Sequence, residues 1–81
     1  MARYSFETKR RAEEVIEEAV GFFGEGGLGL SVVEQASCCV SLEGGGGYVS
    51  VTANPAENKT VVDLETREWD YHVRRFMSEL G

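Results

Sequence analysis

Cys38 and Cys39 are adjacent and carry the most distinctive chemistry in this 81-residue chain. Paired thiols could take part in redox reactions or bind a metal ion. Neighbouring side chains of a β-strand point to opposite faces, so in a strand Cys38 would join the core and Cys39 would reach the surface. A disulfide between adjacent residues would strain the backbone, and the chain offers few further zinc ligands. The sequence therefore predicts a small core residue at Cys38 and an incidental surface thiol at Cys39.

The histidine and the carboxylates form no recognisable catalytic or metal-binding motif. His72 is the single histidine, and a catalytic histidine needs a nucleophile or a carboxylate partner. Its spacing from Trp69 and Phe76 is typical of a residue at the border of an apolar helix face. The acidic residues lack the fixed spacing of a calcium-binding loop. The sequence therefore favours a protein without enzymatic activity, and we expect no cofactor and no metal site.

The charge of the chain is acidic and unevenly distributed. The formal net charge is −6, and no Lys or Arg occurs between Arg11 and Lys59. A nucleic-acid surface needs a continuous positive potential, so general nucleic-acid binding is not expected. The acidic middle of the chain instead suits a protein partner with a basic surface. No run of about 18 apolar residues and no signal-peptide pattern is present, so we expect a cytoplasmic protein that does not enter the membrane.

Two segments have apolar residues at helical spacing. Residues 6–23 carry one stripe made of Ala12, Val15, Ile16, Ala19, Phe22 and Phe23. Ser5 is a suitable N-cap for this helix and Gly24 a suitable end. Residues 67–80 carry a second stripe made of Trp69, Val73, Phe76, Met77 and Leu80. Thr66 is the expected N-cap of this closing helix.

The segment between the helices alternates apolar and polar residues, which predicts β-strands. The expected strands cover residues 28–33, 35–42, 48–53 and 60–65. We expect a bend or bulge near Glu34, a hairpin tip at the four glycines 44–47, and a loop over residues 54–59.

These elements predict one α+β domain over residues 1–81. Three or four antiparallel strands would follow the first helix and precede the second. Since each helix has a single apolar stripe, both helices should cover the same face of the sheet, which gives a two-layer sandwich.

The uncovered outer face of this sheet is the expected binding surface. The alternation places small hydroxyl residues and acids there, and the candidate residues are Ser37, Cys39, Ser41, Tyr48, Ser50, Thr52 and Asp63. Glu65 alternates with the core in the same way as Asp63. An antiparallel sheet also tolerates a simply solvated face.

Three functional hypotheses follow from these observations. The first is a non-enzymatic protein-interaction or regulatory module, with a homodimer as one form, because a small core gains from assembly. The alternative is a small-ligand or metal carrier that uses the outer face. The third is a thiol-dependent redox protein centred on Cys39.

Overall fold

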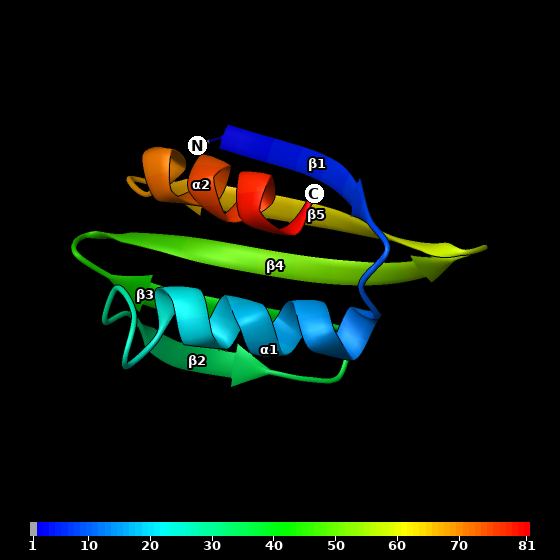
Figure 1. Cartoon of the computed structure of the whole chain (residues 1–81). Coiled ribbons are helices and arrows are strands. Elements are labelled where there is room, and N and C mark those ends of the chain that lie inside the picture. Colours follow the sequence, from blue (N-terminus) through cyan, green and yellow to red (C-terminus); the bar gives the residue numbers. More distant parts are fainter. Residues whose placement is uncertain (1) are drawn as a thin grey trace.

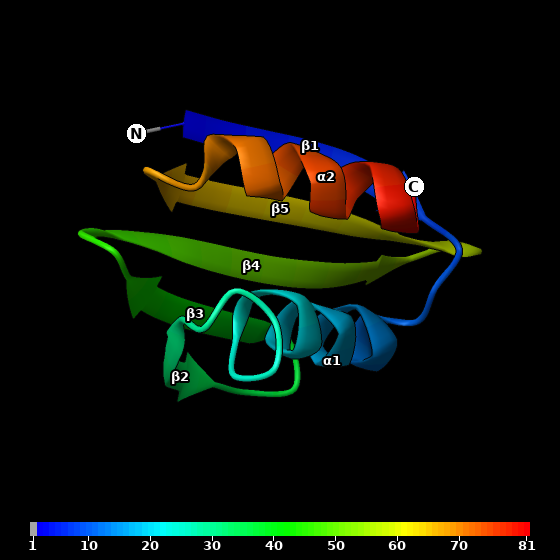
Figure 2. The same cartoon turned by 60° about the vertical axis from the view of Figure 1, so that its left-hand side comes forward.

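The structure, a computed structural model, describes residues 2–81 and contains one five-stranded antiparallel sheet with two helices. The sheet order is β1-β5-β4-β3-β2, so the first and last strands of the chain are neighbours. Both helices lie on one face of the sheet, which confirms the α+β two-layer class (Figures 1 and 2). The elements are β1 (Ala2–Thr8), α1 (Ala12–Phe23), β2 (Ser31–Gln35), β3 (Cys39–Gly44), β4 (Gly47–Ala56), β5 (Lys59–Arg67) and α2 (Asp70–Leu80).

The first element is a strand, so the prediction that the chain opens with a helix over residues 6–23 is wrong. Residues of β1 alternate between partly buried and exposed, which is the period of two that a strand requires. Ser5 lies in β1 opposite Asp63 and caps no helix. The helix begins at Ala12, where the Glu14 carboxylate accepts a hydrogen bond of 2.9 Å from the Arg11 backbone N–H. The sheet therefore has five strands, more than the predicted three or four.

The two helices divide the inner face of the sheet between them. α1 packs on β3 and β4, while α2 packs on β5 and β1. Phe22 and Phe23 of α1 meet Phe76 of α2 with ring centroids 5.5 and 5.2 Å apart, which joins the helices to one core. Figure 2 shows this arrangement, with α2 lying over the β1–β5 side of the sheet and α1 over the other side. Within residues 2–81, no helix or strand covers the outer face.

The segment after α1 folds as a short hairpin, with a bulge at the predicted place. Pairing of β2 with β3 shifts register between Val32 and Glu34, so the expected irregularity near Glu34 is confirmed. The second strand begins at Cys39, because the chain turns through Ala36 to Cys38. Ala36 and Cys38 are consequently exposed, although continuous alternation predicted both in the core.

β4 begins after the expected glycine turn and continues further than the alternation alone suggested. Gly45 and Gly46 form the expected glycine turn before β4, with φ of 58° and 81°. The predicted loop over residues 54–59 is wrong in extent, since Asn54 and Pro55 continue β4 opposite Val61 and Thr60. The turn comprises only residues 57 and 58, where Asn58 adopts φ of 64°.

The closing helix also begins later than predicted. Thr66 belongs to β5, where its buried hydroxyl donates a hydrogen bond of 2.8 Å to the Tyr48 carbonyl. The helix starts at Asp70, and its buried residues Val73, Phe76 and Leu80 belong to the predicted stripe.

Candidate functional site

The outer face of the sheet gathers six of the seven predicted residues. Residues that pair directly across antiparallel strands share a face, so Cys39, Thr52 and Asp63 form one row with Ser5. The adjacent row joins Ser41, Ser50, Glu65 and Arg3 across the same four strands. Tyr48 lies on the same face, opposite Glu43 and Arg67. Ser37 is the exception, because it lies in the exposed β2–β3 turn and not on the sheet.

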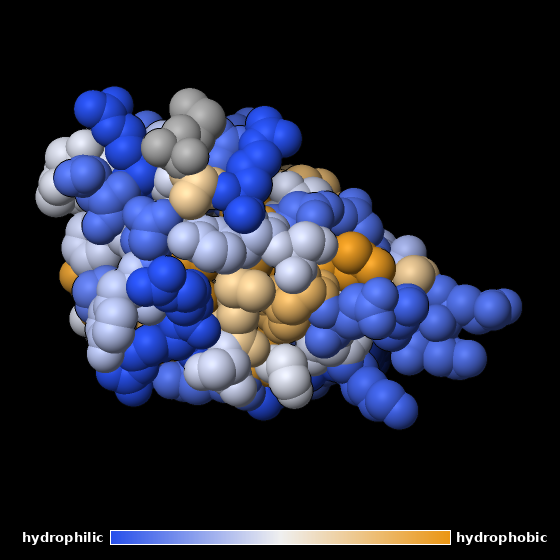
Figure 3. All heavy atoms as spheres, turned by 90° about the horizontal axis from the view of Figure 1, so that it is seen from above, coloured by the Kyte–Doolittle hydropathy of each residue, from blue (hydrophilic) through white to orange (hydrophobic). Residues whose placement is uncertain are grey.

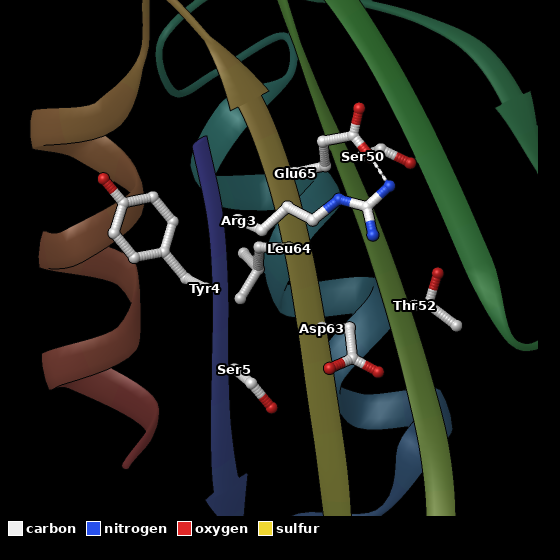
Figure 4. A pocket seen from close by; sticks show the side chains of 8 residues that line it. All are labelled: Arg3, Tyr4, Ser5, Ser50, Thr52, Asp63, Leu64 and Glu65. Atoms are coloured by element: carbon white, nitrogen blue, oxygen red, sulfur yellow. Dashed lines mark ion pairs between the residues drawn. The ribbon is translucent and has the colours of Figure 1, made fainter. Parts of the chain in front are cut away.

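A hollow of about 500 Å³, open to solvent, lies on this face over β1, β5 and β4. Figure 4 shows its polar side chains rising from β1, β5 and β4, while Tyr4 points aside toward α2. The lining residues are Arg3, Tyr4, Ser5, Ser50, Thr52, Asp63, Leu64 and Glu65. Sequence reasoning misses Arg3 and Ser5 because it places a helix directly after them. The sequence does carry a signal for this strand, because Ala2, Tyr4 and Phe6 alternate with the polar Arg3, Ser5 and Glu7.

A hydrogen-bonded and ion-paired cluster orders the centre of the outer face. The Tyr48 hydroxyl donates a hydrogen bond of 2.7 Å to Glu65 Oε2, and Arg3 Nη2 lies 3.3 Å from Glu65 Oε1. The hydrogen bond to the Glu65 carboxylate raises the pKa of Tyr48 above 10.0, and loss of hydration adds to the effect. Tyr48 therefore stays neutral at physiological pH and serves as a hydrogen-bond donor.

The remaining polar groups of the face are also partly ordered. Asn54 Nδ2 donates a hydrogen bond of 3.1 Å to Asp63 Oδ2, and the hydroxyls of Ser41 and Ser50 lie 3.4 Å apart. His72 belongs to α2 on the other side of the sheet, where it packs against the rings of Trp69 and Tyr71. The hydroxyls of the outer face thus have no imidazole beside them to act as a base.

The two cysteines are joined by a disulfide, contrary to the prediction of a core residue and a surface thiol. Cys38 is exposed and Cys39 is half-buried at the start of β3. The prediction failed because the strand alternation stops at the β2–β3 turn, where Cys38 leaves the sheet. The Cys38 carbonyl accepts a hydrogen bond of 2.8 Å from the Ala53 backbone N–H, which attaches this turn to β4. The thiol at Cys39 that the redox hypothesis requires is consequently available only after reduction of the disulfide.

Clusters of metal ligands and membrane-spanning helices are both absent from residues 2–81. No group of three or more His, Cys, Asp or Glu side chains in this range is placed to hold a metal ion. Neither helix in the range has the length and hydropathy that crossing a bilayer requires. The sequence matches no protein-family model and no curated protein.

Proposed function

We propose that this protein is a non-enzymatic protein-interaction module that binds a partner with a basic surface through the outer face of its sheet. The observation that carries this proposal is the one-sided placement of α1 and α2, which leaves a five-stranded face with ordered polar side chains in contact with solvent. A surface ordered in advance loses little side-chain entropy when a partner binds.

The charges of the outer face favour a basic partner. Its acids are Glu7, Glu34, Glu43, Asp63 and Glu65, and its bases are Arg3, Lys59 and Arg67. Two of the bases already contact acids within the chain, since Arg3 lies 3.3 Å from Glu65 and Lys59 lies 3.0 Å from Glu7. Lysine or arginine side chains of a partner would meet the carboxylates of Asp63 and Glu43.

The chemistry of the face supports binding more than catalysis. The raised pKa of Tyr48 keeps its hydroxyl protonated, so it cannot act as a base at neutral pH. The serine and threonine hydroxyls pair with one another or face solvent, and no activated nucleophile is formed. These groups suit hydrogen bonds to the side chains or backbone of another protein.

The hollow supports a second candidate function, the carriage of a small polar ligand. Its lining offers a guanidinium at Arg3, a carboxylate at Asp63 and hydroxyls at Ser50 and Thr52. Native mass spectrometry distinguishes this candidate, because a carrier retains an additional mass that an interaction module lacks.

A cytoplasmic location remains part of the proposal. In that compartment thiol reductants would act on the exposed Cys38–Cys39 disulfide. A redox role for this disulfide would therefore depend on which form is present in the cell.

A pair of charge substitutions tests the proposed face. Immobilised wild-type protein, Asp63→Lys and Glu17→Lys are exposed to the same cell lysate, and the retained proteins are identified by mass spectrometry. Glu17 is exposed on α1, so its variant makes the same change of charge away from the outer face. We expect Asp63→Lys to lose partners that wild type and Glu17→Lys both retain. Equal retention by all three proteins would contradict the proposal.

A further inference from the structure

We propose that two copies of this protein join edge to edge through β1, independently of what binds the outer face. β1 is the end strand of the sheet, so among residues 2–81 only β5 pairs with it. Its seven residues pair with β5 in an unbroken register from Ala2–Thr66 to Thr8–Thr60. An unpaired edge of this kind presents backbone N–H and C=O groups that a further strand can use. Joining two such edges makes one sheet from the five strands of each copy.

The sequence of β1 is complementary to itself when two copies run antiparallel about Ser5. In this register Arg3 lies opposite Glu7 of the partner subunit, and the same pair forms again on the other side of the twofold axis. Tyr4 lies opposite Phe6 of the partner subunit, also twice. Opposite charges and aromatic pairs directly across an antiparallel ladder both stabilise it. A twofold interface requires this kind of self-complementarity.

The charged half of the interface extends ion pairs that already exist in each copy. Arg3 contacts Glu65 at 3.3 Å and Glu7 contacts Lys59 at 3.0 Å, all on the outer face. Pairing of the β1 edges would connect Glu65, Arg3, Glu7 of the partner subunit and Lys59 of the partner subunit in a diagonal row, because Glu7 lies opposite Val61 and reaches Lys59 one position further along β5. The signs of charge alternate along this row, and ion-pair networks contribute more than isolated exposed pairs.

The apolar half of the interface lies on the inner face, beside α2. Tyr4, Phe6 and Met77 pack against the core but are only partly buried. Figure 3 looks onto the β1 side of the molecule and shows apolar atoms gathered at its centre with hydrophilic side chains around them. A second copy would cover part of this apolar surface, which is the arrangement of an interface with a hydrophobic centre and a polar rim.

The other free edge does not have these properties. An antiparallel pairing of two β2 strands about Val33 would place the apolar Val32 opposite the acidic Glu34. The register shift next to Val33 also bends this edge away from a regular ladder. The second copy is therefore assigned to β1.

Cysteine cross-linking tests the register directly. Ser5 lies on the proposed twofold axis, so in Ser5→Cys the two new Cβ atoms would be about 5 Å apart, close enough for a disulfide after small adjustments. In the control Glu7→Cys the two positions would be roughly 14 Å apart, because they are offset by four residues along the strands. We expect Ser5→Cys to form a covalent dimer, with the link mapped by peptide mass spectrometry to the substituted position of both copies, and Glu7→Cys to stay monomeric. Equal cross-linking of both variants, or of neither, would overturn the proposal.

Charge substitutions test the interface without a covalent link. Arg3→Glu and Glu7→Arg each place like charges opposite each other in a self-pair, so sedimentation velocity should show weaker association of each variant than of wild type. A mixture of the two variants restores both opposite-charge pairs and should associate more tightly than either variant alone. Each variant also loses its own internal ion pair, and mixing does not restore that pair, so a gain on mixing reports the interface. A wild type that remains monomeric at millimolar concentration, or a mixture no tighter than its components, would overturn the proposal.

Discussion

The two edges of the sheet, β1 and β2, differ in how they present their unpaired backbone. β2 has five residues, all exposed, and its ladder shifts register between Val32 and Glu34. β1 has seven residues, a regular ladder and no proline or bulge. Short, bulged and charged edges are the usual protection against pairing with other chains. The comparison indicates that β2 is protected as an end of the sheet, whereas β1 retains the features of a strand that can accept a partner.

The two edges also differ in how firmly they are packed: α2 holds β1, whereas two valines of β2 face solvent. β1 is held by α2 through Thr8, whose hydroxyl donates a hydrogen bond of 2.8 Å to the Leu80 carbonyl, and through Tyr4, which donates one of 2.9 Å to Asp70. β2 presents Val32 and Val33 to solvent, with 41% and 53% of their surfaces exposed. A rigid edge loses less entropy on pairing than a loosely held one. The more firmly anchored edge is therefore the one better prepared for association.

The largest expected effect comes from truncating the core beneath α2, the helix that packs on β5 and β1. Phe76 is fully buried and joins α2 to the rings of α1, so Phe76→Ala should cost about 3–5 kcal/mol in unfolding free energy. At the other edge, Val32→Ala should cost less than about 1 kcal/mol because Val32 is 41% exposed. Urea denaturation measures both values. Similar losses for the two variants would contradict the difference in anchoring.

A smaller effect is expected from the polar anchor of β1. Thr8 is buried, and its hydroxyl also accepts a hydrogen bond of 3.2 Å from the Arg10 backbone N–H. Thr8→Val leaves both backbone partners without this hydroxyl and should cost about 1–3 kcal/mol. Ser31→Val at the exposed start of β2 is the control and should change stability by no more than about 0.5 kcal/mol. Denaturant midpoints measure both changes in stability. A Thr8→Val variant as stable as wild type would show that this contact does not anchor β1.

The disulfide should have a modest effect that is confined to the β2 side. The covalent ring contains only two adjacent residues, so loop-closure entropy predicts a loss of about 1 kcal/mol in the double variant Cys38→Ser, Cys39→Ser. Amide hydrogen exchange should become faster in β2 and the β2–β3 turn and stay unchanged in β1. Faster exchange spread evenly over both edges would contradict this localisation.

The smallest effect is expected at Tyr48, which lies on β4 between the two edges. Tyr48→Phe removes the hydrogen bond to Glu65 and should lower stability slightly at neutral pH. The folded state raises the pKa of Tyr48 above 10.0. The hydrogen bond of the protonated hydroxyl therefore contributes its full amount to the stability of the fold below pH 10, and this contribution is lost as the pH rises through the raised pKa. The stability difference between wild type and Tyr48→Phe should therefore shrink above pH 10. Thermal unfolding at neutral pH and in this alkaline range measures it, and a difference that grows with pH would contradict the assignment.

The sequence predicts the central strands, the helical stripes and the bulge near Glu34, but not the edge strand β1. Ser50 and Thr52 on β4 and Asp63 on β5 follow strict alternation in strands paired on both sides, so their common face could be predicted. β1 could not be recognised with the same ease, because its strand character depends on pairing with β5, which begins about 50 residues after β1 ends. The prediction for Cys38 fails for a related reason, since one turn after Gln35 breaks the alternation.

The arrangement of Arg3 and Glu65 shows the same limit for the candidate site. Alternation placed Glu65 on the outer face, but its partner Arg3 comes from the far end of the chain. Only the sheet order brings the two together.

Amide hydrogen exchange of wild-type protein at low and high concentration tests the contrast between the edges most directly. The account predicts that exchange of β1 amides slows as the concentration rises, while exchange of β2 amides does not change, because only β1 acquires hydrogen bonds from a second copy. Exchange of β1 that is independent of concentration, or slowing in β2 in its place, would contradict the assignment of the two edges.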